Sequence, residues 1–234
     1  MGVLMLVRHG QAAFGAENYD VLSSQGVRQS RRVAEILAGY GVEPTSMIHG
    51  GMRRQRETAE EMLRGAAAWK LPLEMDQRWR ELDHLAVMNA YPTLSEEDRE
   101  LLRTGGMEVR AFHELYTKAT ARWASGAYDS DYPGSFPQFI GRVRDGIGHA
   151  ARRAGERRTA VVITSAGVIA AACAMLTEVG EQPRALAAAW ARFNAVVVNV
   201  SVTRIVVGST GARLLSFNEH AALDRHLVLS LIHI

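Results

Sequence analysis

An arginine and a histidine stand side by side near the start of the chain, directly after a short apolar run. Residues 3–7, Val-Leu-Met-Leu-Val, have the length of a buried strand, and Arg8, His9 and Gly10 follow at once. A guanidinium is a bidentate receptor for anions, and an imidazole titrates near neutral pH, so it can serve as a nucleophile or a base. The pattern predicts a phosphate site at the end of this strand.

A second group of basic residues follows another short strand, expected at residues 44–49. Arg53, Arg54 and Arg56 crowd the start of the helix that comes next. An arginine at a strand-to-helix junction faces the same sheet edge as Arg8, so two guanidinium groups could hold one phosphoryl group. For Arg53 and Arg56 we favour ordinary ion pairs on the helix surface, because acidic residues lie at helical spacings from them, at Glu57, Glu60 and Glu61.

These segments resemble the histidine phosphatase superfamily, also called phosphoglycerate mutase-like. Its hallmark is an Arg-His-Gly triplet after the first strand. Its Leu-Thr-x-x-Gly-x-x-Gln pattern is matched by Leu22, Ser23, Gly26 and Gln29, and its Arg four residues before Thr-Ala is matched by Arg54, Thr58 and Ala59. The resemblance covers most of the chain, mainly residues 3–30, 50–61, 78–83 and 160–170. Gly50 departs from it, since the family usually has Ser or Thr there.

The resemblance implies two-step phosphoryl transfer that needs no metal or other cofactor. Neutral His9 would attack phosphorus while Arg8 and Arg54 hold the negative charge, and Gln11 is a further candidate phosphate contact. Glu81 occupies the place of the family's general acid, and Asp83 competes with it. A carboxyl keeps its proton near neutral pH only when it is desolvated or lies near another negative charge. The alternative for Glu81 is a surface ion pair with Arg78 or Arg80.

Ser165 is the main departure from the family pattern. A buried strand at residues 160–163 leads through Thr164, Ser165, Ala166 and Gly167 into an Ala-rich helix. The family has Ser-His-Gly-Gly at this turn, so we expect a branch with Ser165 in place of the second catalytic His. The N–H groups of the helix start still attract an anion, but they do not replace a cation, and weak activity is expected.

The expected function is therefore that of a phosphatase acting on a phosphomonoester through a phosphohistidine at His9. Ser165 favours one alternative, a catalytically impaired protein that binds a phosphorylated ligand or partner. A phosphoglycerate mutase fits less well, because it would have to retain the phosphohistidine while its substrate reorients, without the second His.

The elements that must position these residues alternate between strands and helices. A helix from Ser23 or Ser24 to about Gly41 follows a possible lid at residues 11–22, and a further strand is expected at residues 71–75. Helices at residues 95–102 and 108–123 belong to an insertion at 84–134, and another helix spans 136–154. One long strand or two joined strands begin after Asn194, and a last strand covers 213–217 after a hairpin turn.

This order predicts an α/β fold: a three-layer α/β/α sandwich with a mostly parallel central sheet and an antiparallel edge strand. We expect a single domain at residues 1–228, followed by an uncertain tail at 229–234.

The composition is that of a soluble globular protein. The chain has 234 residues, 47% hydrophobic, and its 27 basic and 25 acidic side chains nearly balance, which argues against a nucleic-acid partner. No apolar run approaches the roughly 18–20 residues of a membrane helix, and the N-terminus does not look like a signal peptide. A lone cysteine, Cys173, favours a cytoplasmic location and a packing role. The expected partner is a small phosphorylated substrate, with no nucleic acid and no membrane; an oligomer is possible but not indicated.

Overall fold

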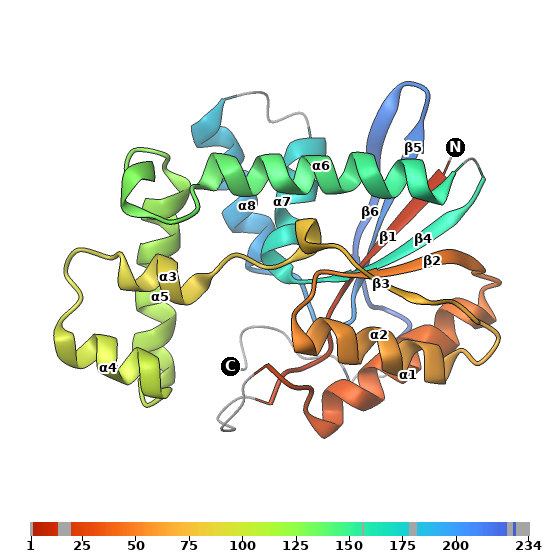
Figure 1. Ribbon diagram of the computed structural model, residues 1–234, viewed down its shortest axis with the longest axis horizontal. Helices are drawn as coiled ribbons and strands as arrows, with labels where there is room; N and C mark the ends of the chain where they lie inside the picture. The colour runs from red at the N-terminus through yellow and green to blue at the C-terminus, as the bar shows by residue number, and fades with distance from the viewer. Residues whose placement is uncertain (1, 14–19, 156, 178–181, 224–226, 228–234) are drawn as a thin grey trace.

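A six-stranded sheet lies at the centre of the residues that the computed structural model describes, which are 2–13, 20–155, 157–177, 182–223 and 227 (Figure 1). The strand order is β3-β2-β4-β1-β5-β6. The first four of these run parallel, whereas β5 is antiparallel to β1 and β6 is antiparallel to β5. The strands are β1 Gly2–Arg8, β2 Pro44–His49, β3 Leu73–Met75, β4 Thr159–Thr164, β5 Val202–Gly208 and β6 Gly211–Glu219. The predicted mostly parallel sheet with an antiparallel edge is confirmed.

Helices cover both faces of this sheet and extend beyond one end of it (Figure 1). α1 and α2 pack on one face, and α6, α7 and α8 pack on the other. α3, α4 and α5 project to one side of the sheet. The helices are α1 Ser24–Gly39, α2 Arg53–Gly65, α3 His84–Asn89, α4 Glu96–Thr104, α5 Val109–Ala124, α6 Phe136–Ala154, α7 Ala166–Leu176 and α8 Pro183–Asn194.

The central strands are apolar on both sides because each of their faces is covered by helices. Along β1, Leu4 and Leu6 join the core beneath α6 and α7, while Met5 and Val7 join the core beneath α1 and α2. This division follows from the two-residue period of a strand, whose successive side chains point to opposite faces. The residue after the strand therefore emerges at a rim bounded by two packed layers.

Short polar side chains cap the starts of several helices. The hydroxyl of Ser23 accepts from the backbone N–H of Gly26 at the start of α1. The expected helices of the insertion are present as α4 and α5, with Ser95 capping α4 and Gly105 ending it at φ +71°. Cys173 is buried in α7, and burial raises the pKa of its thiol to about 12, which agrees with a packing role.

The segment after α8 differs from the prediction. Residues 195–201 were expected to be extended, but pairing with β1 begins only at Val202. Val200 has a positive φ of 53°, and the Asn218 side chain bonds to the backbone of Val196 and Val198. The β-branched residues of this segment give it the sequence pattern of a strand, but contacts with residues distant in the chain hold it in a turn.

Two helices were not predicted from the sequence, and some predicted segments lie outside the described residues. α8 begins at Pro183, which suits the first turn of a helix, and the short α3 begins after Asp83. Residues 14–19 of the expected lid and the tail at 229–234 are not described. The ends of that loop meet in an antiparallel bridge between Ala12 and Leu22. Within the described part, no helix is both long and apolar enough to span a bilayer.

Candidate active site

The candidate site lies where the neighbouring parallel strands β1 and β4 end. Arg8 pairs with Thr164 in register, and the backbone N–H of His9 donates to the Thr164 carbonyl at 2.9 Å. The Arg8-His9 turn and Ser165 therefore leave adjacent strands at the same level. This rim at the carboxyl ends of parallel strands is the usual place for ligands in α/β folds.

The His9 ring is held through both of its nitrogens. Arg54 Nε donates to His9 Nε2 at 3.1 Å, and His9 Nδ1 lies 2.7 Å from the carbonyl oxygen of Gly10. Because a guanidinium only donates and a carbonyl only accepts, Nδ1 carries the ring hydrogen and Nε2 presents its lone pair. His9 is 6% exposed, so this nitrogen lies in a sheltered site next to a cation.

The surroundings of His9 keep it neutral. Burial lowers the pKa of His9 well below its usual value, and the charges of Arg54 and Arg8 lower it further. The Gly10 carbonyl acts in the opposite direction, since it stabilises the protonated ring. The imidazole is therefore unprotonated at neutral and mildly acidic pH, as a nucleophile must be.

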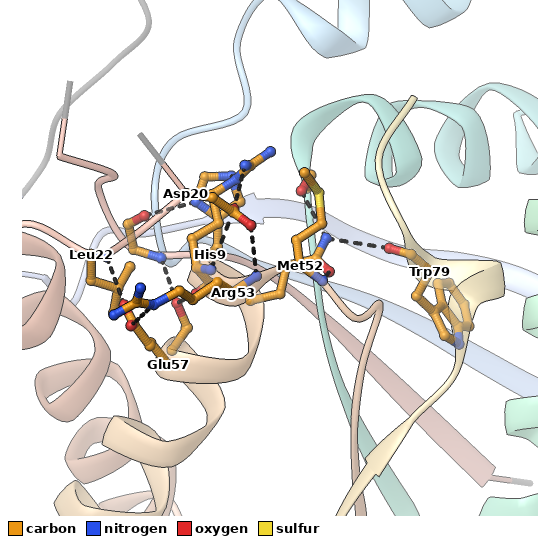
Figure 2. A network of polar contacts seen from close by, with 12 residues as sticks. His9, Asp20, Leu22, Met52, Arg53, Glu57 and Trp79 are labelled. Atoms are coloured by element: carbon orange, nitrogen blue, oxygen red, sulfur yellow. Dashed lines mark hydrogen bonds and ion pairs between the residues drawn. The ribbon is translucent and has the colours of Figure 1, made fainter. Parts of the chain in front are cut away.

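Arg54 is fixed by a carboxylate that the sequence did not single out. Its side chain is 6% exposed, and its Nη1 donates to Asp20 Oδ1 at 2.7 Å. The same carboxylate accepts from the backbone N–H of Arg53 at 2.9 Å and so caps the start of α2 (Figure 2). Leu22 adds a bond from its N–H to Glu57, which ties the end of the loop to α2.

The neighbours of Arg54 on α2 have the expected surface roles. Arg53 pairs with Glu57 at 2.8 Å and Arg56 with Glu60 at 3.4 Å, and all four belong to the outer side of the helix. Thr58 does more than complete a sequence pattern: its hydroxyl donates to the Arg54 carbonyl and accepts from the N–H of Gly10 at 3.0 Å. α2 and the His9 turn are thereby joined directly.

Arg8 and His9 are also anchored from the segment after α8. The Arg8 guanidinium donates to the carbonyl of Val197, and Asn199 Nδ2 donates to the carbonyl of His9 at 2.9 Å. Both contacts come from the residues that were predicted to be a strand. This segment thus supports the base of the site, a role that the local sequence did not reveal.

Glu81 enters the same rim from the loop that follows β3. Its carboxylate accepts from the N–H of Gly167 and from that of Leu82, each at 2.9 Å. A Cβ at Gly167 would lie 2.5 Å from Glu81 Oε1, so this approach requires glycine. Burial raises the pKa of Glu81, while the two N–H donors and the charge of Arg54 act against the rise.

The alternatives considered for the general acid were a surface ion pair for Glu81 and a role for Asp83, and their surroundings differ from those expectations. Arg78 pairs with Asp76 at 2.8 Å rather than with Glu81. Asp83 is exposed and accepts from the N–H of Ala86 as the cap of α3. Between the two carboxyls, Glu81 is therefore the one in the setting that a general acid needs. Gly50 also has a local reason, because a Cβ there would lie 2.2 Å from the Trp79 carbonyl oxygen.

Ser165 and Gln11 have different surroundings. Ser165 is 1% exposed at the start of α7, and its hydroxyl accepts from Gln55 Nε2 at 2.9 Å. Gln11 uses its side-chain oxygen to accept from the Ser23 hydroxyl at 2.8 Å, while its N–H donates to Gln29. The structure thus brings Arg54 into contact with His9, next to Arg8 in the chain, places Ser165 at the end of the neighbouring strand, and binds Gln11 to the start of α1.

A cavity of about 200 Å³ borders Glu81 on the side of the helical insertion. Its walls are mainly aromatic and apolar, and they include Val87, Trp123, Tyr132 and Phe139. Arg142 also lines it and donates to the carbonyls of Gln77, Arg78 and Arg80, which fixes the segment leading to Glu81. In the described part of the chain, no three His, Cys, Asp or Glu side chains cluster closely enough to hold a metal ion.

Solved structures of known proteins share the fold of this chain. Bacillus stearothermophilus YhfR has the same fold, with a TM-score of 0.68 at 19% identity over 96% of this chain and all of that one, 100%. A phosphoserine phosphatase mutant from Entamoeba histolytica, in complex with phosphoserine, has a TM-score of 0.66 at 18% identity over 96% and 100% of the two chains. The chain therefore shares its fold with these two proteins.

Sequence comparison gives matches to part of the chain. Residues 4–104 match the family model described as histidine phosphatase superfamily (branch 1). A 2,3-bisphosphoglycerate-dependent phosphoglycerate mutase from Maricaulis maris (strain MCS10) is 35% identical over 86 residues, which are 34% of this chain and 35% of that protein, about a third of its length. The chain is thus similar to the histidine phosphatase superfamily over residues 4–104, which are less than half of its length.

Proposed function

We propose that the protein is a phosphatase that hydrolyses a phosphomonoester through a phosphohistidine on His9. The observation that carries this proposal is the state of the His9 ring. Its hydrogen is on Nδ1, and its Nε2 lone pair faces the cation that would hold the phosphoryl group. A neutral imidazole in that position is a nucleophile for phosphorus.

In the first step, His9 Nε2 forms a bond to phosphorus as the bond from phosphorus to the ester oxygen breaks. Arg54 and Arg8 balance the charge on the three equatorial oxygens, so no metal ion is required in this proposal. Glu81 gives its proton to the departing oxygen, which leaves as an alcohol. In the second step, Glu81 takes a proton from water, the oxygen of that water attacks phosphorus, and phosphate leaves His9.

The cavity beside Glu81 is the proposed place for the organic part of the substrate. A leaving group there would lie next to the carboxyl that protonates it. The walls of the cavity come partly from the insertion at residues 84–134, so these residues would select among phosphomonoesters. A cytoplasmic location remains part of the proposal.

A protein that binds a phosphorylated ligand without turnover is the second candidate. It is favoured by the neutral Ser165 at the start of α7, because binding needs only the two arginines and the helix N–H groups. A mutase is disfavoured for the same reason, since a long-lived phosphohistidine would lack a second imidazole beside it.

Turnover of p-nitrophenyl phosphate between acidic and neutral pH tests the proposal. We expect hydrolysis by the wild type and a loss of more than about 1,000-fold in His9→Ala, because the nucleophile is gone. His113→Ala removes an exposed imidazole on α5 and serves as the control. Hydrolysis that survives in His9→Ala would reject the role of His9, whereas phosphate binding without any wild-type turnover would support the second candidate.

A further inference from the structure

The side-chain amide of Gln55 bridges α2, α7 and the segment after β3. Gln55 is 0% exposed. Its Nε2 donates to Ser165 Oγ at 2.9 Å and to the Trp79 carbonyl at 3.4 Å, and its Oε1 accepts from the N–H of Met52 at 3.3 Å (Figure 2). The Met52 N–H can only donate and the Trp79 carbonyl can only accept, so the orientation of the amide is determined by its partners.

This contact defines how the Ser165 hydroxyl is used. The hydroxyl makes no capping bond to the N–H groups of α7, although Ser165 stands at the cap position. It accepts from Gln55 instead, and within the described residues its own hydrogen reaches no acceptor. A serine oxygen whose lone pair is engaged on one side presents its hydrogen to another side. Ser165 therefore has a donor hydrogen at the rim where His9 also lies. The two positions are linked there, because the backbone N–H of His9 donates to the carbonyl of Thr164, the residue before Ser165.

We infer that Gln55 is a positioning residue, which orients the Ser165 hydroxyl so that its hydrogen is donated to an oxygen of the phosphoryl group attacked by His9. The inference rests on the proposed function. It accounts for a large buried polar side chain at position 55, beside Arg54 and directed toward α7. The pair Gln55 and Ser165 supplies a neutral donor at the start of α7, where it adds to the helix N–H groups.

A purely structural role for Gln55 would also tie α2 to α7, so the test must separate the two. Gln55→Met keeps the length of the side chain and removes the amide. Gln55→Glu keeps the shape and reverses the polarity, because a carboxylate accepts the Ser165 hydrogen and turns it away from the substrate. A structural role predicts changes in stability, whereas a positioning role predicts changes in kcat/KM that depend on the donor direction.

We expect Gln55→Met to lower kcat/KM for p-nitrophenyl phosphate roughly 10- to 100-fold, as for partners that orient a reacting group. Ser165→Ala should lower kcat/KM by a factor in the same range. The kcat/KM of the double variant should be no lower than that of the less active single variant, because both changes remove the same donor. The inference would be overturned if the two single-variant losses in kcat/KM multiply in the double variant, or if kcat/KM is unchanged in Gln55→Met.

The pH profile gives the second readout. In Gln55→Glu the deficit relative to wild type should be largest where the introduced carboxyl is ionised, and it should shrink as pH falls and the protonated carboxyl donates to Ser165 again. The ionisable groups at this rim are shared by all variants: Arg8, His9, His49, Arg54 and Glu81. A deficit that does not change with pH relative to wild type would contradict the positioning role.

Glu61→Gln is the matched control on α2, since it weakens the partly exposed ion pair with Arg31 on α1 but lies away from the rim. We expect it to lower the melting temperature with kcat/KM unchanged. If the wild type shows no turnover, the proposed function fails, and titration with inorganic phosphate decides the inference separately. Weaker phosphate binding in Gln55→Glu than in Gln55→Met would support it, and equal affinity in all variants would reject it.

Discussion

His9 is held through both ring nitrogens, and each contact has a distinct chemical effect. Gly10 fixes the hydrogen on Nδ1, and Arg54 faces the lone pair on Nε2. Burial and the two arginines lower the pKa of His9, whereas burial raises the pKa of Glu81. The pKa values of the proposed nucleophile and of the proposed acid are thus shifted toward each other's usual range, which is the pattern expected when a base and an acid act together.

The pH dependence of kcat/KM follows from these directions. The lowered pKa of His9 means that the nucleophile is lost only well below pH 6.5, so the acidic limb should lie in that region. The raised pKa of Glu81 means that the acid keeps its proton above its usual range, and activity should fall as pH rises through that value. We expect Glu81→Gln to abolish the alkaline limb and lower the rate, whereas Asp83→Asn should retain the alkaline limb. An alkaline limb that persists in Glu81→Gln would exclude Glu81 as the acid.

At the scale of elements, the start of α7 organises the site. In its first turn, the N–H of Gly167 donates to the Glu81 carboxylate. The hydroxyl of its cap residue, Ser165, accepts from Gln55, and the carbonyl of the residue before the cap accepts from the N–H of His9. Three segments distant in sequence therefore meet on one turn. At Gly167 the Glu81 carboxylate comes so close that a Cβ would lie 2.5 Å from Glu81 Oε1.

Gly167→Ala should therefore reduce activity even though alanine normally favours a helix. A new Cβ would displace the Glu81 carboxylate, and we expect kcat/KM to fall by about 10- to 100-fold. Gly141→Ala in α6 is the control, because no neighbouring atom lies within 4 Å of the position that a Cβ would take there. That change should stabilise the protein by up to about 1 kcal/mol without affecting kcat/KM. Equal activity in both variants would refute the importance of the Glu81 approach.

Much of the element order could be predicted because its signals are local. Short continuous apolar runs marked β1 and β4, helical patterns marked α1 and α6, and the polar residues after β1 indicated a site at its end. The contacts of Asp20, Gln55 and Asn199 could not be predicted in this way, because each joins segments far apart in the chain. The prediction for the apolar run at residues 195–201 was wrong for the same reason, since its turn is held by Asn218 and Arg8.

At the scale of the molecule, the sheet is a platform between two cores, and the site occupies the rim where they end. Residues from β1, α2, the loop after β3 and the start of α7 converge there, and the insertion contributes a cavity beside them. A sheet buried on both faces is rigid, which suits a site that must hold a phosphoryl group and an imidazole in line. In the proposed function, the insertion selects the substrate and the rim carries out the chemistry.

The most direct test is to quench the protein during turnover of a phosphomonoester and to locate the phosphoryl group by mass spectrometry under alkaline conditions, in which phosphohistidine survives. We expect one phosphorylated residue, His9, in the wild type and in Arg53→Ala. The intermediate should form about 100- to 1,000-fold more slowly in Arg54→Ala, because a pre-organised donor to the phosphoryl oxygens is lost. Steady hydrolysis with His9 never phosphorylated, or phosphorylation of another side chain, would contradict the proposed mechanism.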